Sequence, residues 1–185
     1  MLILVSGGSG SGKSEYAEKV ACRFFQDRGG KAGKLYYIAT MVSFDAETDR
    51  RIARHRALRD GKGFYTIECP THLEKVECQG GDVLLLECMS NLLANEMFGE
   101  DGRLRETEET EVSVITDAVD AMNSRVETFV IVTNEIFSDG KKYDETTERY
   151  RKRLGIINQK LAEMAGVVVE VVCGIPVSVK GELPC

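Results

Sequence analysis

A glycine-rich segment near the start of the chain restricts the possible folds more than any other feature. Residues 7–14 read Gly-Gly-Ser-Gly-Ser-Gly-Lys-Ser and match the G-x-x-x-x-G-K-S pattern of a phosphate-binding loop. An apolar run at residues 2–5 precedes the loop, and a helical pattern from Glu15 follows it. A loop in this context turns backbone N–H groups toward phosphate oxygens at the start of a helix. The sequence therefore predicts a binding site for a nucleoside triphosphate.

Individual residues of this phosphate loop have expected roles. Lys13 should reach the β- and γ-phosphates, and the hydroxyl of Ser14 should bind a Mg²⁺ ion. Glu87 follows the apolar run at 83–86 and should hold the same ion through water, unless it is simply a solvated carboxylate at a strand end. The residues expected to contact the phosphates are Gly7, Gly8, Ser9, Gly10, Ser11, Gly12, Lys13 and Ser14.

Short apolar runs alternate with longer helical patterns along the chain. Continuous Val, Ile and Leu runs are typical of strands buried on both faces of a parallel sheet that is flanked by helices. The predicted strands are 2–5, 35–39, 64–67, 83–86, 129–133 and 167–172, with a short edge strand within 174–180. The predicted helices are 15–27, 46–59, 91–98, a segment entered from the acidic residues 100–111 and ending near 123, and 146–164. Because no repeat or linker interrupts this order, we expect one α/β domain over residues 1–185.

Composition excludes several classes of protein. The net charge of −6 disfavours a nucleic-acid binder, which needs a basic surface for the phosphate backbone. No apolar stretch approaches the roughly 20 residues of a membrane span, and residues 1–5 are too short for a signal-peptide core. The six cysteines and two histidines lack the spacing of a zinc site. We therefore expect a cytoplasmic protein with reduced thiols and a small-molecule partner.

One stretch concentrates positive charge around a histidine. Residues 50–59 contain five arginines, no acidic residue and His55. An unmixed positive helix predicts an anionic partner, either acidic side chains of the same protein or phosphates. A neutral imidazole can attack the α-phosphorus of a nucleotide while guanidinium groups stabilise the transition state, so His55 is a candidate nucleophile. The alternative is a salt-bridged or exposed histidine on a basic helix, and His72 is expected to be an ordinary loop residue.

A series of short segments, in order over nearly the whole chain, matches one known family. They are the phosphate loop, Tyr37-Ile-Ala-Thr40, Asp45, Glu47, Arg51-Ile52 with His55, Thr66-Ile-Glu68, Leu86-Glu87-Cys88, Asn91-Leu92-Leu93, Thr133-Asn134-Glu135, Asn158-Gln-Lys-Leu-Ala162, and Gly174-Ile-Pro176 with Lys180. In these segments the chain resembles the adenosylcobinamide kinase / adenosylcobinamide-phosphate guanylyltransferase family of cobalamin biosynthesis. The stretch from Ile-Ala-Thr to Arg-Ile-x-x-His is far more specific than the phosphate loop.

The resemblance implies a P-loop NTPase (RecA-like) sheet, a homotrimer and two reactions on a corrinoid. In the first, ATP or GTP phosphorylates the aminopropanol hydroxyl of adenosylcobinamide. In the second, GTP guanylylates an enzyme histidine, and the GMP passes to the phosphorylated cobinamide to give adenosylcobinamide-GDP. His55 matches the guanylylated position. By the same implication the guanine nucleotide is contacted by Ala39, Thr40, Met41, Arg56, Ala57, Leu58, Arg59, Glu68 and Glu87.

One segment departs from the family pattern. Many members follow Thr-Asn-Glu with a glycine-rich stretch that ends in Val-Pro, whereas residues 136–144 here read Ile-Phe-Ser-Asp-Gly-Lys-Lys-Tyr-Asp. The departure bears on contacts to the corrinoid and on the kinase step, but not on the chemistry of His55. Two other functions remain open: a P-loop kinase for another small alcohol, in which His55 and the arginines hold phosphates, and a RecA-like nucleotide-binding regulator without acceptor chemistry.

Overall fold

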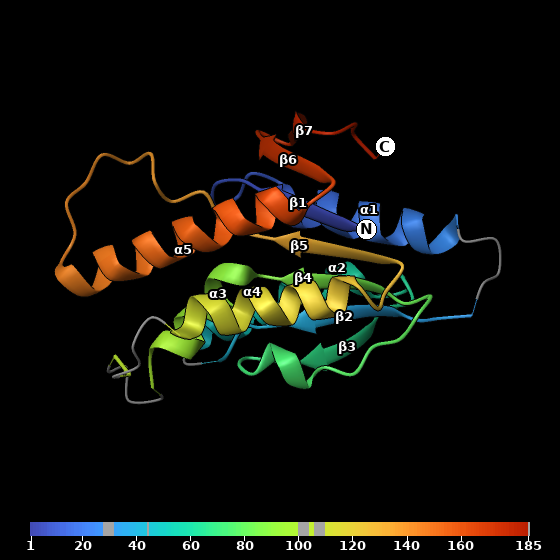
Figure 1. Cartoon of the computed structure of the whole chain (residues 1–185), viewed down its shortest axis with the longest axis horizontal. Helices are drawn as coiled ribbons and strands as arrows, with labels where there is room; N and C mark the ends of the chain where they lie inside the picture. Colours follow the sequence, from blue (N-terminus) through green and yellow to red (C-terminus); the bar gives the residue numbers. More distant parts are fainter. Residues whose placement is uncertain (28–31, 44, 100–103, 106–109, 185) are drawn as a thin grey trace.

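The centre of the molecule is one seven-stranded sheet in the order β3-β2-β4-β5-β1-β6-β7 (Figure 1). The computed structural model describes residues 1–27, 32–43, 45–99, 104–105 and 110–184, and only the backbone of Arg51, Leu58 and Thr110. The strands are β1 (Leu2–Ser6), β2 (Leu35–Ala39), β3 (Tyr65–Glu68), β4 (Val83–Glu87), β5 (Thr128–Val132), β6 (Val167–Val172) and β7 (Ile175–Lys180). Every neighbouring pair is parallel except β6 and β7. The predicted α/β fold with a mostly parallel sheet is confirmed.

Helices cover both faces of the sheet. Helix α1 (Lys13–Gln26) packs on one face against alternate strand residues such as Leu85 and Val130. The other face carries the short 3-10 helix η1 (Leu73–Lys75) and the helices α3 (Met89–Met97), α4 (Thr110–Asn123) and α5 (Glu145–Met164). In Figure 1 α4 and α5, in yellow and orange, run side by side across this face. Helix α2 (Ala46–Arg59) connects β2 to β3.

Burial follows the position of each strand in the sheet. All residues of β4 and β5 are buried, as the continuous apolar runs predict for central parallel strands. The edge strands β3 and β7 are largely exposed instead. Because successive side chains of a strand point to opposite faces, Leu84 belongs to the apolar cluster under α4 and α5, and Leu85 to the cluster under α1.

The predicted element boundaries are close to the observed ones. The bounds of β2, α2 and β6 agree with the prediction, and most other ends differ by one or two residues. Helix α1 begins at Lys13, earlier than predicted, because the left-handed Gly12 (φ 91°) leads directly from the phosphate loop into the helix. Helix η1 was not predicted. Of the acidic segment expected before α4, residues 100–103 and 106–109 lie outside the described residues.

No helix within the described ranges is both long enough and apolar enough to cross a membrane.

Candidate active site

The phosphate loop connects β1 to α1 and is held by the turn between β6 and β7. The backbone N–H of Gly174 donates to the carbonyl of Ser11 at 2.8 Å. A Cβ atom on Gly7 would lie 2.7 Å from the carbonyl oxygen of Val171, so only glycine fits this position. The left-handed Gly12 (φ 91°) then places α1 directly behind the loop. The result is a curved backbone at the N-terminal end of a helix, which favours anions.

Lys13 lies inside this curve. Its ammonium group donates to the carbonyl of Gly8 at 3.0 Å, and the residue is only 8% exposed. Burial lowers the pKa of Lys13, and the nearby Cys88 and Glu87 oppose this effect. A buried cation held by one carbonyl oxygen is well placed to exchange that contact for phosphate oxygens.

Glu87 is the residue on which the site converges. It ends β4, is 9% exposed, and accepts hydrogen bonds from the Ser14 hydroxyl and, at 2.7 Å, from the Tyr37 hydroxyl. The Nδ1 atom of His55 lies 3.8 Å from Glu87 Oε1, an ion-pair distance that is too long for a hydrogen bond. Burial, followed by the charge of Glu87, raises the pKa of Tyr37, so its hydroxyl remains a donor. Glu87 is therefore a buried, hydrogen-bonded carboxylate and not a solvated one.

Thr40 fixes the strand end that carries Glu87. Its hydroxyl donates to the carbonyl of Cys88 at 2.9 Å and accepts from the Cys88 N–H at 2.8 Å. Its N–H donates to the carbonyl of Glu87, and its carbonyl accepts from Asn95. The Glu87–Cys88 peptide bond is cis. Since these bonds engage its hydroxyl, amide and carbonyl, Thr40 acts within the protein as a support for the end of β4.

Helix α2 brings His55, Arg56 and Arg59 to this edge of the sheet. Asp45 caps the helix by accepting from the N–H of Thr48 at 2.7 Å. His55 is one-quarter exposed, and its buried Nδ1 has no hydrogen-bond partner among the described residues. The guanidinium carbon of Arg59 lies 3.5 Å from the centroid of the Tyr37 ring, and Arg59 is buried. The exposed Arg56 pairs with the exposed Glu68 at 3.1 Å.

A pocket of about 650 Å³ lies beside the C-terminal end of α2. It is lined by Arg56, Arg59, Asp60, Gly61, Gly63, Phe64, Thr66 and Glu68. Its volume suits a small ligand. Its arginines can bind phosphate groups, and its carboxylates can accept hydrogen bonds from a ring that carries N–H donors.

The structure places the predicted site residues in two adjoining groups. Ser14, Glu87 and His55 meet at the C-terminal end of β4. Arg56, Arg59 and Glu68 line the pocket. Of the other residues expected to bind nucleotide, Ala39 and Met41 are partly buried near the end of β2, and Ala57 is exposed on α2. The Leu58 side chain lies outside the described residues. The sequence analysis missed the role of Tyr37, for which the only local signal was a pair of tyrosine hydroxyls, Tyr36 and Tyr37, in an otherwise apolar strand.

The Thr133-Asn134-Glu135 segment joins the same edge from β5. The Thr133 hydroxyl donates to Asn158 at 2.7 Å, and Asn134 donates to the Ser90 hydroxyl at 2.6 Å. The N–H of Glu135 donates to the carbonyl of Gly7 at 3.0 Å, so this segment supports the start of the phosphate loop.

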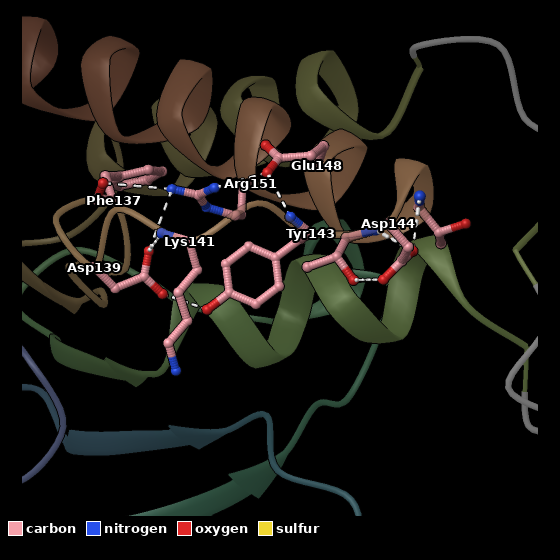
Figure 2. Close-up of polar contacts among 9 residues, drawn as sticks. Phe137, Asp139, Lys141, Tyr143, Asp144, Glu148 and Arg151 are labelled. Atoms are coloured by element: carbon pink, nitrogen blue, oxygen red, sulfur yellow. Dashed lines mark hydrogen bonds and ion pairs between the residues drawn. The ribbon is translucent and has the colours of Figure 1, made fainter.

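The departing segment 136–144 folds around one arginine, as Figure 2 shows. Arg151 of α5 donates to Glu148 at 2.9 Å and to the carbonyl of Phe137 at 3.4 Å, and it lies 3.9 Å from Asp139. The Tyr143 hydroxyl donates to Asp139, and the Arg151 guanidinium lies over the Tyr143 ring at 5.2 Å. Asp144 then caps α5 at its N-terminal end.

The fold and the phosphate loop define a P-loop nucleotide-binding protein with an α/β sheet. The sequence profile of the cobinamide kinase / cobinamide phosphate guanyltransferase family matches residues 3–179. The chain belongs to this family.

The chain is also similar to curated relatives over nearly their whole length. The chain is 32% identical to the bifunctional adenosylcobalamin biosynthesis protein CobU of Salmonella typhimurium, covering 97% of this chain and 100% of the relative. It is 31% identical to CobU of Escherichia coli, with the same shares covered. It is also 31% identical to the bifunctional adenosylcobalamin biosynthesis protein CobP of Pseudomonas aeruginosa, covering 97% of each chain.

Proposed function

We propose that this protein phosphorylates adenosylcobinamide and then transfers GMP to the product through a guanylyl-histidine. Family membership supports both activities. The observation that carries the second one is the position of His55, which faces Glu87 and adjoins the phosphate loop. The product is adenosylcobinamide-GDP, made from a corrinoid alcohol, ATP or GTP as the phosphate donor, and GTP as the GMP donor.

In the kinase step the acceptor hydroxyl attacks the γ-phosphorus. The bond from the γ-phosphorus to its bridging oxygen breaks, a nucleoside diphosphate leaves, and the proton of the hydroxyl is released to water. Lys13 neutralises charge on the β- and γ-phosphates, and the N–H groups of the phosphate loop orient them.

In the guanylyl-transfer step His55 attacks the α-phosphorus of GTP. A proton on Nδ1 would face the Glu87 carboxylate, which leaves the lone pair on Nε2 for the attack. The new N–P bond replaces the bond to the bridging oxygen, and pyrophosphate leaves. A phosphate oxygen of adenosylcobinamide phosphate then attacks the same phosphorus, forms the diphosphate link and restores the free imidazole.

Ser14 and Glu87 fit a Mg²⁺ ion. Their direct contact places a hydroxyl and a carboxylate together, and both offer the oxygen ligands that this ion prefers. Mg²⁺ commonly binds one or two carboxylates together with phosphate oxygens and water, so it needs no cluster of three acidic side chains, and the described residues hold none. When bound, the ion supplies positive charge that neutralises the phosphates.

The pocket beside α2 is suited to the guanine nucleotide. Arg56 and Arg59 would hold phosphate oxygens. The carboxylate of Glu68 can accept hydrogen bonds from the N1–H and amino group of guanine, whereas adenine presents an acceptor at N1. This difference favours GTP as the donor of the nucleotidyl group.

Labelling with GTP that carries the label on its α-phosphate tests the guanylyl-transfer proposal. The wild-type protein should acquire an acid-labile label, and His55→Ala should acquire none, because the nucleophile is gone. The matched control is His72→Ala, since His72 is the other of the two histidines and is exposed directly before η1, where it pairs with Glu74. Label on His55→Ala would overturn the assignment, and an unlabelled wild type that still transfers γ-phosphate would favour the simple kinase.

We further propose that residues 1–185 act as one nucleotide-binding domain, in a cytoplasmic homotrimer. The seven-stranded sheet formed by the described strands supports the first statement. The family resemblance supports the trimer, and the cytoplasmic location is the expectation from the sequence. Light scattering on the eluting protein gives the oligomeric mass, and a monomer would contradict the trimer.

A further inference from the structure

The contacts that the structure describes for the helix that carries His55 are polar or cation–π contacts. Among the described side chains of α2 only Arg59 is buried, and neither apolar cluster includes one of them. The side chains of Arg56 and Glu68 are both more than half exposed, and exposed ion pairs of this kind contribute little to stability. Among the described contacts, a small number of stronger ones therefore hold His55 over Glu87.

Lys62, just beyond the end of α2, makes such a contact. Its Nζ lies 2.6 Å from Glu18 Oε2, and Glu18 is 1% exposed. The other oxygen of Glu18 is buried without a hydrogen-bond partner among the described residues, so Lys62 is the cation that compensates this carboxylate. Gly61 and Gly63 flank Lys62 with φ of +73° and +81°, and this turn directs the lysine toward α1.

Glu18 lies on the part of α1 that serves the nucleotide site. Ser14 and Glu18 are four residues apart, so they share one helix face and are separated by one turn of about 5.4 Å. The Ser14 hydroxyl contacts Glu87, which in turn faces His55. Successive turns of one helix thus hold the hydroxyl of the expected metal site and the anchor of the helix that carries the nucleophile.

We propose that Lys62 and Glu18 form a positioning pair for guanylyl transfer: they fix the end of α2 on α1 so that His55 faces the α-phosphate. This role rests on the proposed function of His55. Neither residue touches the reacting atoms. The pair serves the nucleotidyl step, whereas phosphoryl transfer from the γ-phosphate uses the phosphate loop and needs no histidine.

The test compares both steps in Lys62→Met, Glu18→Gln and the double variant of the full-length protein. We expect the single-turnover rate of labelling from α-labelled GTP to fall roughly tenfold to a hundredfold, because displacing a reacting group by about 1 Å can cost that much. The rate of γ-phosphate transfer to adenosylcobinamide should stay unchanged. Lys62→Arg keeps the positive charge and should restore most of the labelling rate. Lys19→Met removes an exposed lysine of α1 and is the matched control.

The labelling rate of the double variant shows whether Lys62 and Glu18 act together or have independent effects. If each residue acts through the other, the double variant labels no more slowly than the slower single variant. Wild-type labelling rates in Lys62→Met and Glu18→Gln would overturn the positioning role and leave the His55 mechanism intact. An equal loss in both catalytic steps would also overturn it, because that is the pattern of general destabilisation. A wild-type protein that acquires no label would instead overturn the proposed guanylyl transfer itself, and the pair's role with it.

Discussion

Helices α1 and α2 have the same length of 14 residues and border the same site, but they are attached in opposite ways. Helix α1 buries Tyr16, Ala17, Val20 and Ala21 against the sheet. Helix α2 buries only Arg59 among its described side chains. Apolar packing is roughly additive in area and resists local opening, whereas a few polar contacts allow a helix to open by itself. The molecule therefore combines a phosphate loop that continues into a core helix with the proposed nucleophile, His55, on a helix whose described contacts are mostly polar.

The largest effect on catalysis should come from Lys13, at the start of the buried helix α1. Lys13→Ala should reduce both phosphoryl and guanylyl transfer by about a hundredfold or more, because no water in the loop replaces a buried cation at the transition state. Steady-state rates of both reactions measure this, with the exposed Lys19→Ala as the control. Unchanged turnover would show that the phosphate loop is not the working site.

The next largest difference should appear in the free energy of unfolding, between a variant beneath α1 and a variant on α2. Leu85→Ala, in the fully buried β4 beneath α1, should lower the free energy of unfolding by about 2–5 kcal/mol through lost burial and a cavity. Ile52→Ala, at a partly buried position of α2, should lower it by less than about 1 kcal/mol. Urea unfolding followed by circular dichroism gives both values. Equal losses would mean that α2 is part of the cooperative core.

The smallest effect compares two helix caps. Asp144 and Asp45 both accept hydrogen bonds from N–H groups in the first turn of their helices, α5 and α2. Helix α5 buries Leu154, Ile157 and Leu161, so Asp144→Ala should lower the free energy of global unfolding by about 1 kcal/mol. Asp45→Ala should change that quantity less and should mainly speed hydrogen exchange at the amides near Thr48, because α2 can fray without the core. A larger global loss for Asp45→Ala than for Asp144→Ala would reverse the comparison.

Local signals were sufficient to predict most of the sheet. Buried parallel strands appear as apolar runs: the bounds of β2 follow from such a run, and those of β6 from a run of valines that only Glu170 interrupts. The phosphate loop was predicted because its glycines are required at fixed positions, which the close approach of Gly7 to Val171 illustrates. Helix η1 carries no periodic pattern over its three residues and could not be found in this way.

The contacts that complete the candidate site depend on pairs that are distant in sequence. Glu18 looks like an ordinary charged position of a surface helix, and only the fold shows that it is 1% exposed beneath Lys62. The arginine-rich stretch predicted an anionic partner, either an acidic side chain or a phosphate, and Glu68 is such a side chain. The ring of Tyr37, which Arg59 covers, was not predicted. A preference for an aromatic face cannot be read from charge alone.

The contact between the phosphate loop and the β6–β7 turn has a consequence for how the protein is made. Ser11 is translated long before Gly174, whose N–H donates to the carbonyl of Ser11. The strand β1 that enters the loop is likewise paired with β6, which follows almost all of the other elements. The phosphate loop is therefore synthesised well before the strands that hold it, and the candidate site is completed only when β6 and β7 join the sheet.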